Sequence, residues 1–261
     1  MTSSFVDLAG TRLHYRTDGE RTAPALVLSN SLGTDLSTWD PQIPELAQRF
    51  HVIRYDTRGH GESAVTPGPY TIEQLARDAM GVMDALGVER AHFCGLSLGG
   101  MTGMWLGANQ GYRIDRLVLS NTSARIPNAA AYNTRIENVR ASGMSAVSPA
   151  VIERWFTPHF IATHPAEVAR TRGVLERCPA AGYIAACCAV RDMDQREDVK
   201  SITRPTLVIA GTHDVPTPPS EARFLVDAIA GARYVELPAS HLSNIEAAPL
   251  FTAALMDFFY A

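Results

Sequence analysis

Hydrophobic residues recur along this chain with two different spacings. Short apolar, β-branched runs alternate with longer stretches in which apolar residues return every three or four positions. The first spacing is typical of buried strands and the second of helices that cover a sheet. The alternation predicts an α/β fold, with a mostly parallel eight-stranded sheet and helices on both faces.

The predicted strands begin with a hairpin. The stretch FVDLAGTRLHYR has the pattern of two antiparallel strands that turn near Gly10. The later runs are apolar enough to be buried on both faces, as strands in a parallel sheet are. They cover residues 23–30, 51–56, 90–95, 113–121, 204–211 and 232–238.

The clearest helical pattern covers residues 71–87. Its apolar residues form one stripe, Thr71 is a suitable N-cap, and Gly87 is a suitable C-terminal stop. Similar patterns cover residues 220–230 and 247–260. We expect these helices to pack on the sheet.

Residues 126–200 break the alternation, because no convincing strand lies there and helical stretches follow one another. We interpret this region as an all-helical cap inserted between two strands. The expected organisation is therefore an α/β core in two parts, residues 1–125 and 201–261, with a cap over residues 126–200.

Composition narrows the class of protein. A chain of 261 residues that is 46% hydrophobic and 19% charged can bury a sizeable core as one domain. Its formal net charge of −4, without long Lys/Arg runs, argues against nucleic-acid and polybasic membrane partners. The first ten residues do not resemble a signal peptide, and no apolar run is long enough to span a membrane. We expect a cytoplasmic protein.

The four cysteines have no CxxC spacing and no histidines at ligand intervals. They are expected to be core residues in a reducing compartment, and no metal site is predicted. The cysteines are Cys94, Cys178, Cys187 and Cys188.

One motif carries the chemistry. Residues 95–99 read G-L-S-L-G, with Ser97 at the point where a predicted strand ends and a predicted helix, residues 98–109, begins. This is the context of a nucleophile elbow, in which a sharp turn forces the serine into strained backbone geometry and its neighbours must be small. The alternative is a glycine-rich turn that serves packing alone.

A serine nucleophile needs a base, and the base needs an orienting carboxylate. In the fold with this elbow the chain order is Ser, Asp or Glu, then His. Asp214 follows the strand at 204–211 and His241 follows the strand at 232–238, so both lie near strand ends where ligand-facing groups collect. Each alone could be a turn or loop residue. We predict a Ser97–His241–Asp214 triad in preference to sets that use His213 or the cap residues Asp192, Asp194 and Asp198.

The triad requires an oxyanion hole, because the tetrahedral intermediate carries negative charge on the former carbonyl oxygen. We expect one donor to be the backbone N–H of Leu98, directly after the nucleophile. The other is expected to be the N–H of Leu32, in the loop after the strand at 23–30, with Gly33 leaving room for the backbone to approach the substrate.

The sequence resembles the α/β-hydrolase family, and within it the 3-oxoadipate enol-lactone hydrolases of bacterial aromatic-acid breakdown. The elbow and the VIRYDTRGHGES segment are common to many α/β-hydrolases. The narrower similarity lies in SNSLGTDLSTWDPQ, in RWFTPHF within the cap, in PTLVIAGTHDVPTPP and in ASHLSNIE around the histidine. It runs from about residue 10 to the C-terminus.

The resemblance implies an acyl-enzyme mechanism on a small lactone that carries a carboxylate, with no metal or organic cofactor. The partner is then a small molecule, with no nucleic acid or membrane, and self-association into a homo-oligomer is compatible with the sequence. An arginine of the cap suits the substrate carboxylate, because its planar fork makes two hydrogen bonds. We expect Arg135 in this role, with Arg154 and Arg191 as alternatives. Trp155 and Ser31 complete the expected substrate-binding residues.

Other functions remain open from the sequence. The nearest is a carboxylesterase or perhydrolase-like enzyme in which the same triad accepts neutral esters. A dehalogenase is disfavoured because that branch uses an aspartate where this chain has Ser97. A ligand-binding receptor with this fold is disfavoured by the predicted triad. His60, between two glycines in a loop, is expected to support loop packing rather than catalysis.

Overall fold

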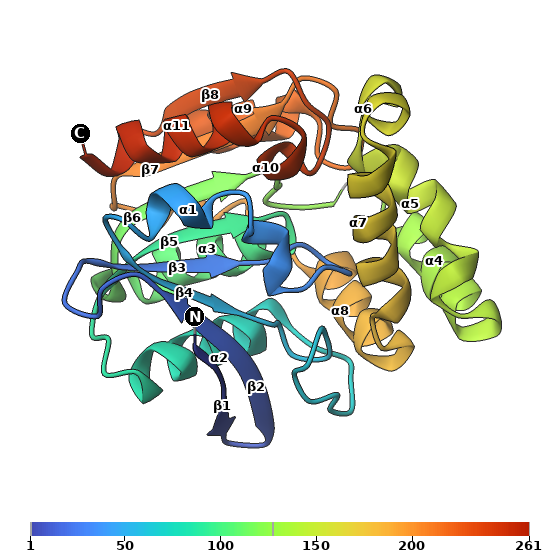
Figure 1. Ribbon diagram of the computed structural model, residues 1–261, viewed down its shortest axis with the longest axis horizontal. Helices are drawn as coiled ribbons and strands as arrows, with labels where there is room; N and C mark the ends of the chain where they lie inside the picture. The colour runs from blue at the N-terminus through green and yellow to red at the C-terminus, as the bar shows by residue number, and fades with distance from the viewer. Residues whose placement is uncertain (1, 127, 261) are drawn as a thin grey trace.

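The sheet has the predicted eight strands. A computed structural model describes residues 2–126 and 128–260, and in these residues the strand order is β1-β2-β4-β3-β5-β6-β7-β8 (Figure 1). β1 and β2 form the hairpin around Gly10, β2 runs antiparallel to β4, and all later neighbours are parallel. The strands are β1 (Thr2–Leu8), β2 (Thr11–Asp18), β3 (Ala25–Ser29), β4 (His51–Tyr55), β5 (Ala91–Leu96), β6 (Ile114–Ser120), β7 (Thr206–Gly211) and β8 (Arg233–Leu237).

Helices cover both faces of the sheet, as the hydrophobic spacing predicts. α3 packs on β3, β5 and β6 behind the sheet in the view of Figure 1, and α1 and α11 pack against each other in front of it. The core helices are η1 (Leu36–Trp39), α1 (Ile43–Leu46), α2 (Ile72–Ala85), α3 (Leu98–Asn109), η2 (Gly111–Arg113), α9 (Pro219–Ala228), α10 (Ser243–Glu246) and α11 (Ala248–Tyr260).

The ends of α2 follow from its sequence. The Thr71 hydroxyl accepts a hydrogen bond from the N–H of Gln74 at 3.1 Å, which satisfies a free donor of the first turn. Gly87 has a φ of +71°, the left-handed conformation that ends many helices and that glycine adopts without strain. Both predicted boundaries are therefore correct to within two residues.

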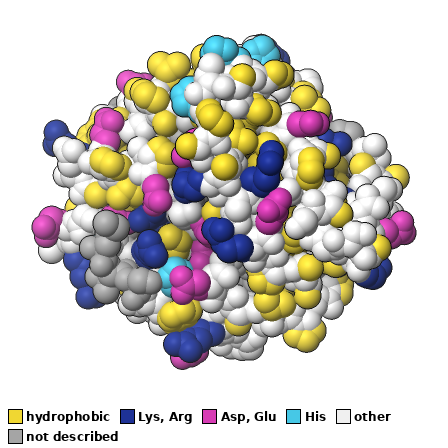
Figure 2. Space-filling view, turned by 45° about the vertical axis from the view of Figure 1, so that its right-hand side comes forward, with side chains coloured by type: hydrophobic (Ala, Val, Ile, Leu, Met, Phe, Trp, Pro, Cys, Tyr) yellow, Lys and Arg dark blue, Asp and Glu magenta, His cyan; other side chains and the backbone are white. Residues whose placement is uncertain are grey.

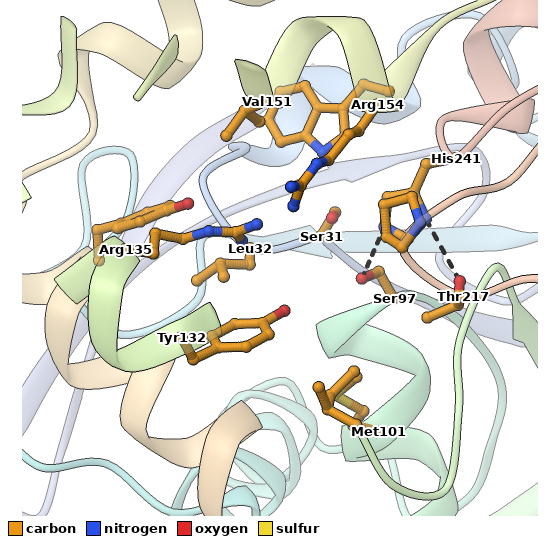
Figure 3. A pocket seen from close by; sticks show the side chains of 14 residues that line it. Ser31, Leu32, Ser97, Met101, Tyr132, Arg135, Val151, Arg154, Thr217 and His241 are labelled. Atoms are coloured by element: carbon orange, nitrogen blue, oxygen red, sulfur yellow. Dashed lines mark hydrogen bonds between the residues drawn. The ribbon is translucent and has the colours of Figure 1, made fainter. Parts of the chain in front are cut away.

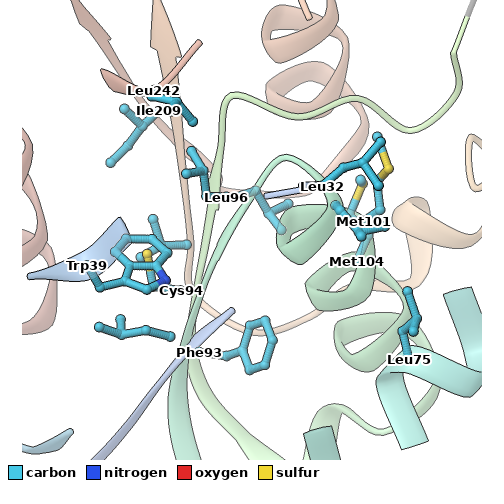
Figure 4. Packing of buried hydrophobic residues seen from close by; sticks show 14 of the residues in the cluster. Leu32, Trp39, Leu75, Phe93, Cys94, Leu96, Met101, Met104, Ile209 and Leu242 are labelled. Atoms are coloured by element: carbon cyan, nitrogen blue, oxygen red, sulfur yellow. The ribbon is translucent and has the colours of Figure 1, made fainter. Parts of the chain in front are cut away.

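The centre of the sheet is packed with apolar side chains on both faces. Phe93, Cys94 and Leu96 of β5 are fully buried, and Figure 4 shows them between Trp39 on one side and Met101 and Met104 of α3 on the other. Burial of such side chains contributes roughly 25 cal/mol per Å² of apolar surface removed from water. This rigid layer fixes the ends of β5 and β6, from which functional side chains project.

The region between β6 and β7 is helical and lies beside the C-terminal ends of the parallel strands, at the right of Figure 1. We propose that residues 126–200 act as a cap on a core formed by residues 1–125 and 201–261; residues 1, 127 and 261 lie outside the described residues. The cap helices are α4 (Ala129–Ser142), η3 (Met144–Ala146), α5 (Ser148–Trp155), α6 (Pro158–Thr163), α7 (Pro165–Arg177), α8 (Ala180–Asp192) and η4 (Asp198–Ser201).

The surface agrees with the modest net charge. Figure 2 turns the cap toward the viewer and shows basic and acidic side chains interspersed over that face. Within the described residues, no helix is both long and apolar enough to cross a membrane. Cys94, Cys178 and Cys187 are buried and Cys188 is half-buried, and all four are free thiols.

Candidate active site

Ser97 stands on a strained turn between β5 and α3. Its φ of +54° and ψ of −109° lie outside the regions that L-residues ordinarily adopt, which costs about 1–3 kcal/mol. The neighbouring backbone holds the turn: the Ser97 N–H donates to the Ser120 carbonyl oxygen at 2.9 Å, and its own carbonyl oxygen accepts from the Thr122 hydroxyl at 2.8 Å. The serine side chain is thereby presented at the end of the sheet.

The two glycines that flank Ser97 are required because a side chain at either position would overlap the neighbouring backbone. A Cβ atom on Gly95 would lie 2.1 Å from the carbonyl oxygen of Gly99, and one on Gly99 would lie 2.1 Å from the carbonyl oxygen of Ser29. Neither backbone oxygen can move without breaking the turn or the sheet. The motif is therefore a sterically closed elbow, as its sequence predicts.

The structure brings together the three side chains predicted to form a triad. His241 Nε2 lies 3.0 Å from Ser97 Oγ, and His241 Nδ1 lies 2.9 Å from Asp214 Oδ2 and 3.0 Å from Oδ1. The three side chains come from the ends of β5, β7 and β8, and all are buried. This is the geometry in which an imidazole can take a proton from a serine while a carboxylate orients it.

Asp214 is held by donors other than the histidine. Its Oδ1 accepts from the N–H of Thr217, and its Oδ2 accepts from the Thr217 hydroxyl and from Asn121 Nδ2, each at 2.9 Å. Burial by itself would raise the pKa of Asp214, but the charge of His241 and the hydrogen bonds from His241, Thr217 and Asn121 outweigh it and hold the pKa below its ordinary value. The carboxylate is therefore ionised at neutral pH.

Of the two predicted oxyanion donors, Leu32 lines the cavity that contains Ser97, and Leu98 directly follows Ser97 in the chain. Leu32 and Leu98 are both buried beside Ser97, and in the part of the chain that the structure describes neither backbone N–H donates to a protein acceptor. Leu98 is the first residue of α3, where N–H groups have no partner inside the helix and the helix dipole favours negative charge. Both N–H groups are thus free to bind an oxyanion.

Gly33 lies where the oxyanion loop meets the cap. A Cβ atom there would lie 2.7 Å from Leu175 Cδ1 and 3.0 Å from Tyr183 Cε2, so the cap helices α7 and α8 occupy the space beside it. Its φ of +81° also favours glycine. The residue therefore allows the oxyanion loop to pack under the cap.

The cavity beside Ser97 has a volume of about 30 Å³ and is formed by core and cap together. Arg135, Trp155 and Ser31, the three predicted substrate-binding residues, all line it. Figure 3 shows the guanidinium groups of Arg135 and Arg154 pointing into the space in front of Ser97 and His241. The full lining is Ser31, Leu32, Ser97, Met101, Ile126, Tyr132, Arg135, Val151, Arg154, Trp155, Tyr183, Pro216, Thr217 and His241.

The three cap arginines considered from the sequence lie in different surroundings. Arg135 is half-buried with its guanidinium 4.8 Å from the centre of the Tyr132 ring, and among the described residues neither Arg135 nor Arg154 forms an ion pair with a carboxylate. Arg191 instead pairs with the adjacent Asp192 and donates to Asn133. Arg191 does not line the cavity, because these contacts hold its side chain elsewhere on α8.

The residues set aside from the triad also lie away from the cavity. Asp192 and Asp194 pair with arginines at the surface, Asp198 is exposed, and His213 is exposed. His60 is fully buried, its Nδ1 faces the Arg58 carbonyl oxygen at 3.2 Å, and burial lowers its pKa. Its place inside the loop agrees with a packing role.

Sequence reasoning did not single out Asn121 and Thr217, which both bond to Asp214. Asn121 has a φ of +46°, its Nδ2 also donates to the Ser240 carbonyl oxygen, and its Oδ1 accepts from the Ser243 hydroxyl. Two signals could have found them. Asn121 directly follows a parallel strand, and Thr217 lies three residues after Asp214, near enough in the chain for a local hydrogen bond between its N–H and the carboxylate.

Comparisons with known proteins agree with this architecture. The family described as alpha/beta hydrolase fold matches residues 24–144. The 3-oxoadipate enol-lactonase 2 of Acinetobacter baylyi is 40% identical over 93% of this chain and 91% of its own length.

The chain belongs to the α/β-hydrolase family. Within this family the 3-oxoadipate enol-lactonase 1 of the same organism is 39% identical over 95% of this chain and 93% of its own length. The crystal structure of an enol-lactonase from Burkholderia xenovorans LB400 superposes with a TM-score of 0.98, at 49% identity, and covers 99% of this chain and 100% of that one. The resemblance noted from the sequence is thereby confirmed, and it includes the cap.

Proposed function

We propose that this α/β-hydrolase opens the ring of 3-oxoadipate enol-lactone and releases 3-oxoadipate through an acyl-enzyme on Ser97. The observation that carries the proposal is the 3.0 Å contact between His241 Nε2 and Ser97 Oγ at the floor of a cavity that two arginines line. The choice of substrate is supported by three similar proteins that are named enol-lactonases and match nearly the whole chain.

Acylation begins when Ser97 Oγ attacks the lactone carbonyl carbon. His241 Nε2 takes the serine proton, and the ionised Asp214 stabilises the imidazolium that forms. The ring C–O bond then breaks and the enol oxygen leaves with the proton that His241 returns. The enol tautomerises to a ketone while the acyl group stays attached to Ser97.

The negative charge of each tetrahedral intermediate falls on the former carbonyl oxygen. The N–H groups of Leu32 and Leu98 donate hydrogen bonds to this oxygen. Leu98 is the first residue of α3, so the helix dipole adds to the stabilisation. One oxyanion donor typically contributes about 10²–10³-fold in kcat. Deacylation repeats the sequence with water as the nucleophile and His241 as its base, and it releases the dicarboxylate product.

Substrate recognition is assigned to the side of the cavity opposite the triad. Arg135 is proposed to bind the carboxylate of the lactone, Trp155 to wall the cavity, and Ser31 to contact the ring from the oxyanion loop. An arginine without an internal carboxylate partner can make two charge-assisted hydrogen bonds to a substrate carboxylate. If the enzyme were a carboxylesterase for neutral esters, these arginines would have no substrate carboxylate to bind.

The direct test is to assay the enol-lactone and a neutral nitrophenyl ester side by side, with Ser97→Ala as the control. The proposal predicts that the acidic lactone has the higher kcat/KM and that Ser97→Ala loses both activities. Turnover of the ester without the lactone would identify a carboxylesterase. Fluorophosphonate labelling of Ser97 without turnover of either compound would identify a receptor.

A further inference from the structure

The cavity beside Ser97 adjoins a second hollow that opens between α4 and α5. This outer hollow has a volume of about 370 Å³ and shares Arg135, Val151 and Arg154 with the inner cavity. Its remaining lining comes from α4, η3 and α5, namely Ala131, Thr134, Asn138, Ala146, Val147 and Ala150. We call it the vestibule. The inner cavity, at about 30 Å³, is far smaller than the vestibule beside it.

The C-terminal end of α5 is fastened to the core. The Leu242 N–H donates to the Trp155 carbonyl oxygen at 3.0 Å, and the Ser240 hydroxyl donates to the Arg154 carbonyl oxygen at 2.9 Å. Glu246 accepts from the Ser240 N–H at 2.8 Å and from the N–H and hydroxyl of Thr157. These bonds tie the α5–α6 junction to the loop that carries His241 and to α10.

α4 is held differently. It packs on α8 and η3, and Arg191 of α8 donates a hydrogen bond to Asn133 of α4. Within the described residues, no side chain of α4 hydrogen-bonds to the core. The vestibule therefore lies between a helix that the core fixes at its C-terminal end, α5, and a helix that contacts other parts of the cap, α4.

The two arginines lie where the vestibule meets the inner cavity. Arg154 projects from fixed α5 and Arg135 from α4, and both guanidinium groups point toward Ser97 (Figure 3). A carboxylate that passes between α4 and α5 meets both positive charges before it reaches the serine. A neutral molecule of the same size gains nothing from them, and a cation is repelled.

We propose that substrates reach Ser97 through the vestibule between α4 and α5, and that Arg154, with Arg135, makes this access route selective for molecules that carry a carboxylate. The selectivity rests on the proposed function, whereas the route does not. Arg154 thus determines specificity at the entrance, in addition to the carboxylate binding assigned to Arg135.

The route is tested by filling the vestibule. Ala150→Trp on α5 and Asn138→Trp on α4 place a large ring in it from opposite walls, and both residues are exposed. Ala162→Trp, at an exposed position of α6 outside the vestibule, is the matched control. Circular dichroism and thermal unfolding verify that each variant is folded.

The proposal predicts that each vestibule variant slows fluorophosphonate labelling of Ser97 by about tenfold or more, because access to the serine limits the second-order rate. The control stays within about twofold of wild type. Wild-type labelling rates in both folded vestibule variants would overturn the route.

The selectivity is tested with two nitrophenyl esters of equal length, one ending in a carboxylate and one in a methyl group. Arg154→Gln is compared with Arg140→Gln, which removes the same charge from an exposed position of α4 outside the vestibule. We expect Arg154→Gln to lower kcat/KM about tenfold or more for the acidic ester and less than about threefold for the neutral one, since only the former loses charge-assisted bonds. Arg140→Gln changes neither by more than about twofold, because an exposed charge away from the route is screened. Equal losses on both esters, or no loss, would overturn the selectivity. Neither the labelling test nor the ester test uses the enol-lactone. If the lactone assay alone fails, both tests can still be interpreted.

Discussion

Two buried pairs of histidine and aspartate lie within residues 2–126 and 128–260, and their difference shows what makes one of them a candidate catalytic group. His241 and Asp214 meet at 2.9 Å, and His14 and Asp56 meet at 2.7 Å. In each pair Nδ1 of the imidazole faces a carboxylate oxygen, and all four side chains are almost fully buried. Distance and burial alone do not distinguish them.

The surroundings do distinguish them. His241 presents Nε2 to Ser97 on the strained elbow, inside a cavity that the cap arginines also line. Asp56 instead accepts from the N–H groups of Leu36 and Glu62, at 2.7 and 2.9 Å. It therefore joins the loop after β3 to the loop after β4. The bond from Leu36 holds the segment that follows Leu32. We interpret His14–Asp56 as a structural pair that supports the oxyanion loop.

The largest expected difference concerns the two histidines. We predict that His241→Gln lowers kcat by about 10⁴-fold or more, because the serine loses its base. His14→Gln is expected to keep kcat within about tenfold, because its ring does not contact the reacting atoms. Steady-state kinetics on folded protein measure both. A loss of comparable size in His14→Gln would show that the pairs are not functionally distinct.

The two aspartates should differ in what their substitution impairs, which is catalysis for Asp214 and stability for Asp56. Asp214→Asn is predicted to lower kcat by about 10³–10⁴-fold, since the imidazole is no longer oriented and balanced by a charge. Asp56→Asn is expected to lower the free energy of unfolding by about 3 kcal/mol, because it disrupts a buried pair, while the folded fraction stays active. Urea unfolding together with kcat per folded enzyme checks this. Unchanged stability in Asp56→Asn would contradict the structural interpretation.

Asn121 tests how much the setting of the catalytic carboxylate contributes. Its bond to Asp214 Oδ2 is a hydrogen bond to a charged group, which contributes about 1.5–3 kcal/mol. Asn121→Gly keeps the left-handed backbone and removes the amide, so kcat should fall about tenfold with KM little changed. Asn121→Asp places a second carboxylate beside Asp214 and should shift the acidic limb of the pH profile upward. An unmoved pH profile in Asn121→Asp would leave Asn121 with a purely structural role.

The smallest expected effect concerns a buried histidine without a carboxylate contact. Burial lowers the pKa of His60 in the folded state, whereas the unfolded chain binds the proton below about pH 6.5. The contribution of this residue is therefore complete above that pH and declines as the pH falls through it, by up to about 1.4 kcal/mol per pH unit. His60→Asn should reduce the slope of unfolding free energy between pH 7 and pH 5. An unchanged slope would show that His60 is not the group that titrates.

Most of the fold could be predicted because hydrophobic spacing encodes it directly. The eight strands, the helix from Thr71 and the elbow at Ser97 all follow from local patterns, and the triad follows from residues at strand ends. α6 and α7 were not singled out, because two prolines, Pro158 and Pro165, open them in close succession and their apolar stripes are narrow.

The rest of the site depends on contacts between distant segments. His14 and Asp56 are 42 positions apart, and no sequence pattern indicates that they pair. The packing of Gly33 under α7 and α8, and the bond from Thr157 at the α5–α6 junction to Glu246, arise from the way the cap sits on the core. Local spacing gives elements and their ends, but it does not give the packing of one element on another.

The most direct test of the central claim is to trap the covalent intermediate by rapid acid quench and identify it by mass spectrometry. Opening a lactone expels no fragment, so the proposed acyl-enzyme gains the whole mass of the lactone. The account predicts that this gain lies on the peptide containing Ser97, and that it is lost in Ser97→Ala and retained in His14→Gln. An adduct on a different residue, or one that persists in Ser97→Ala, would contradict the account.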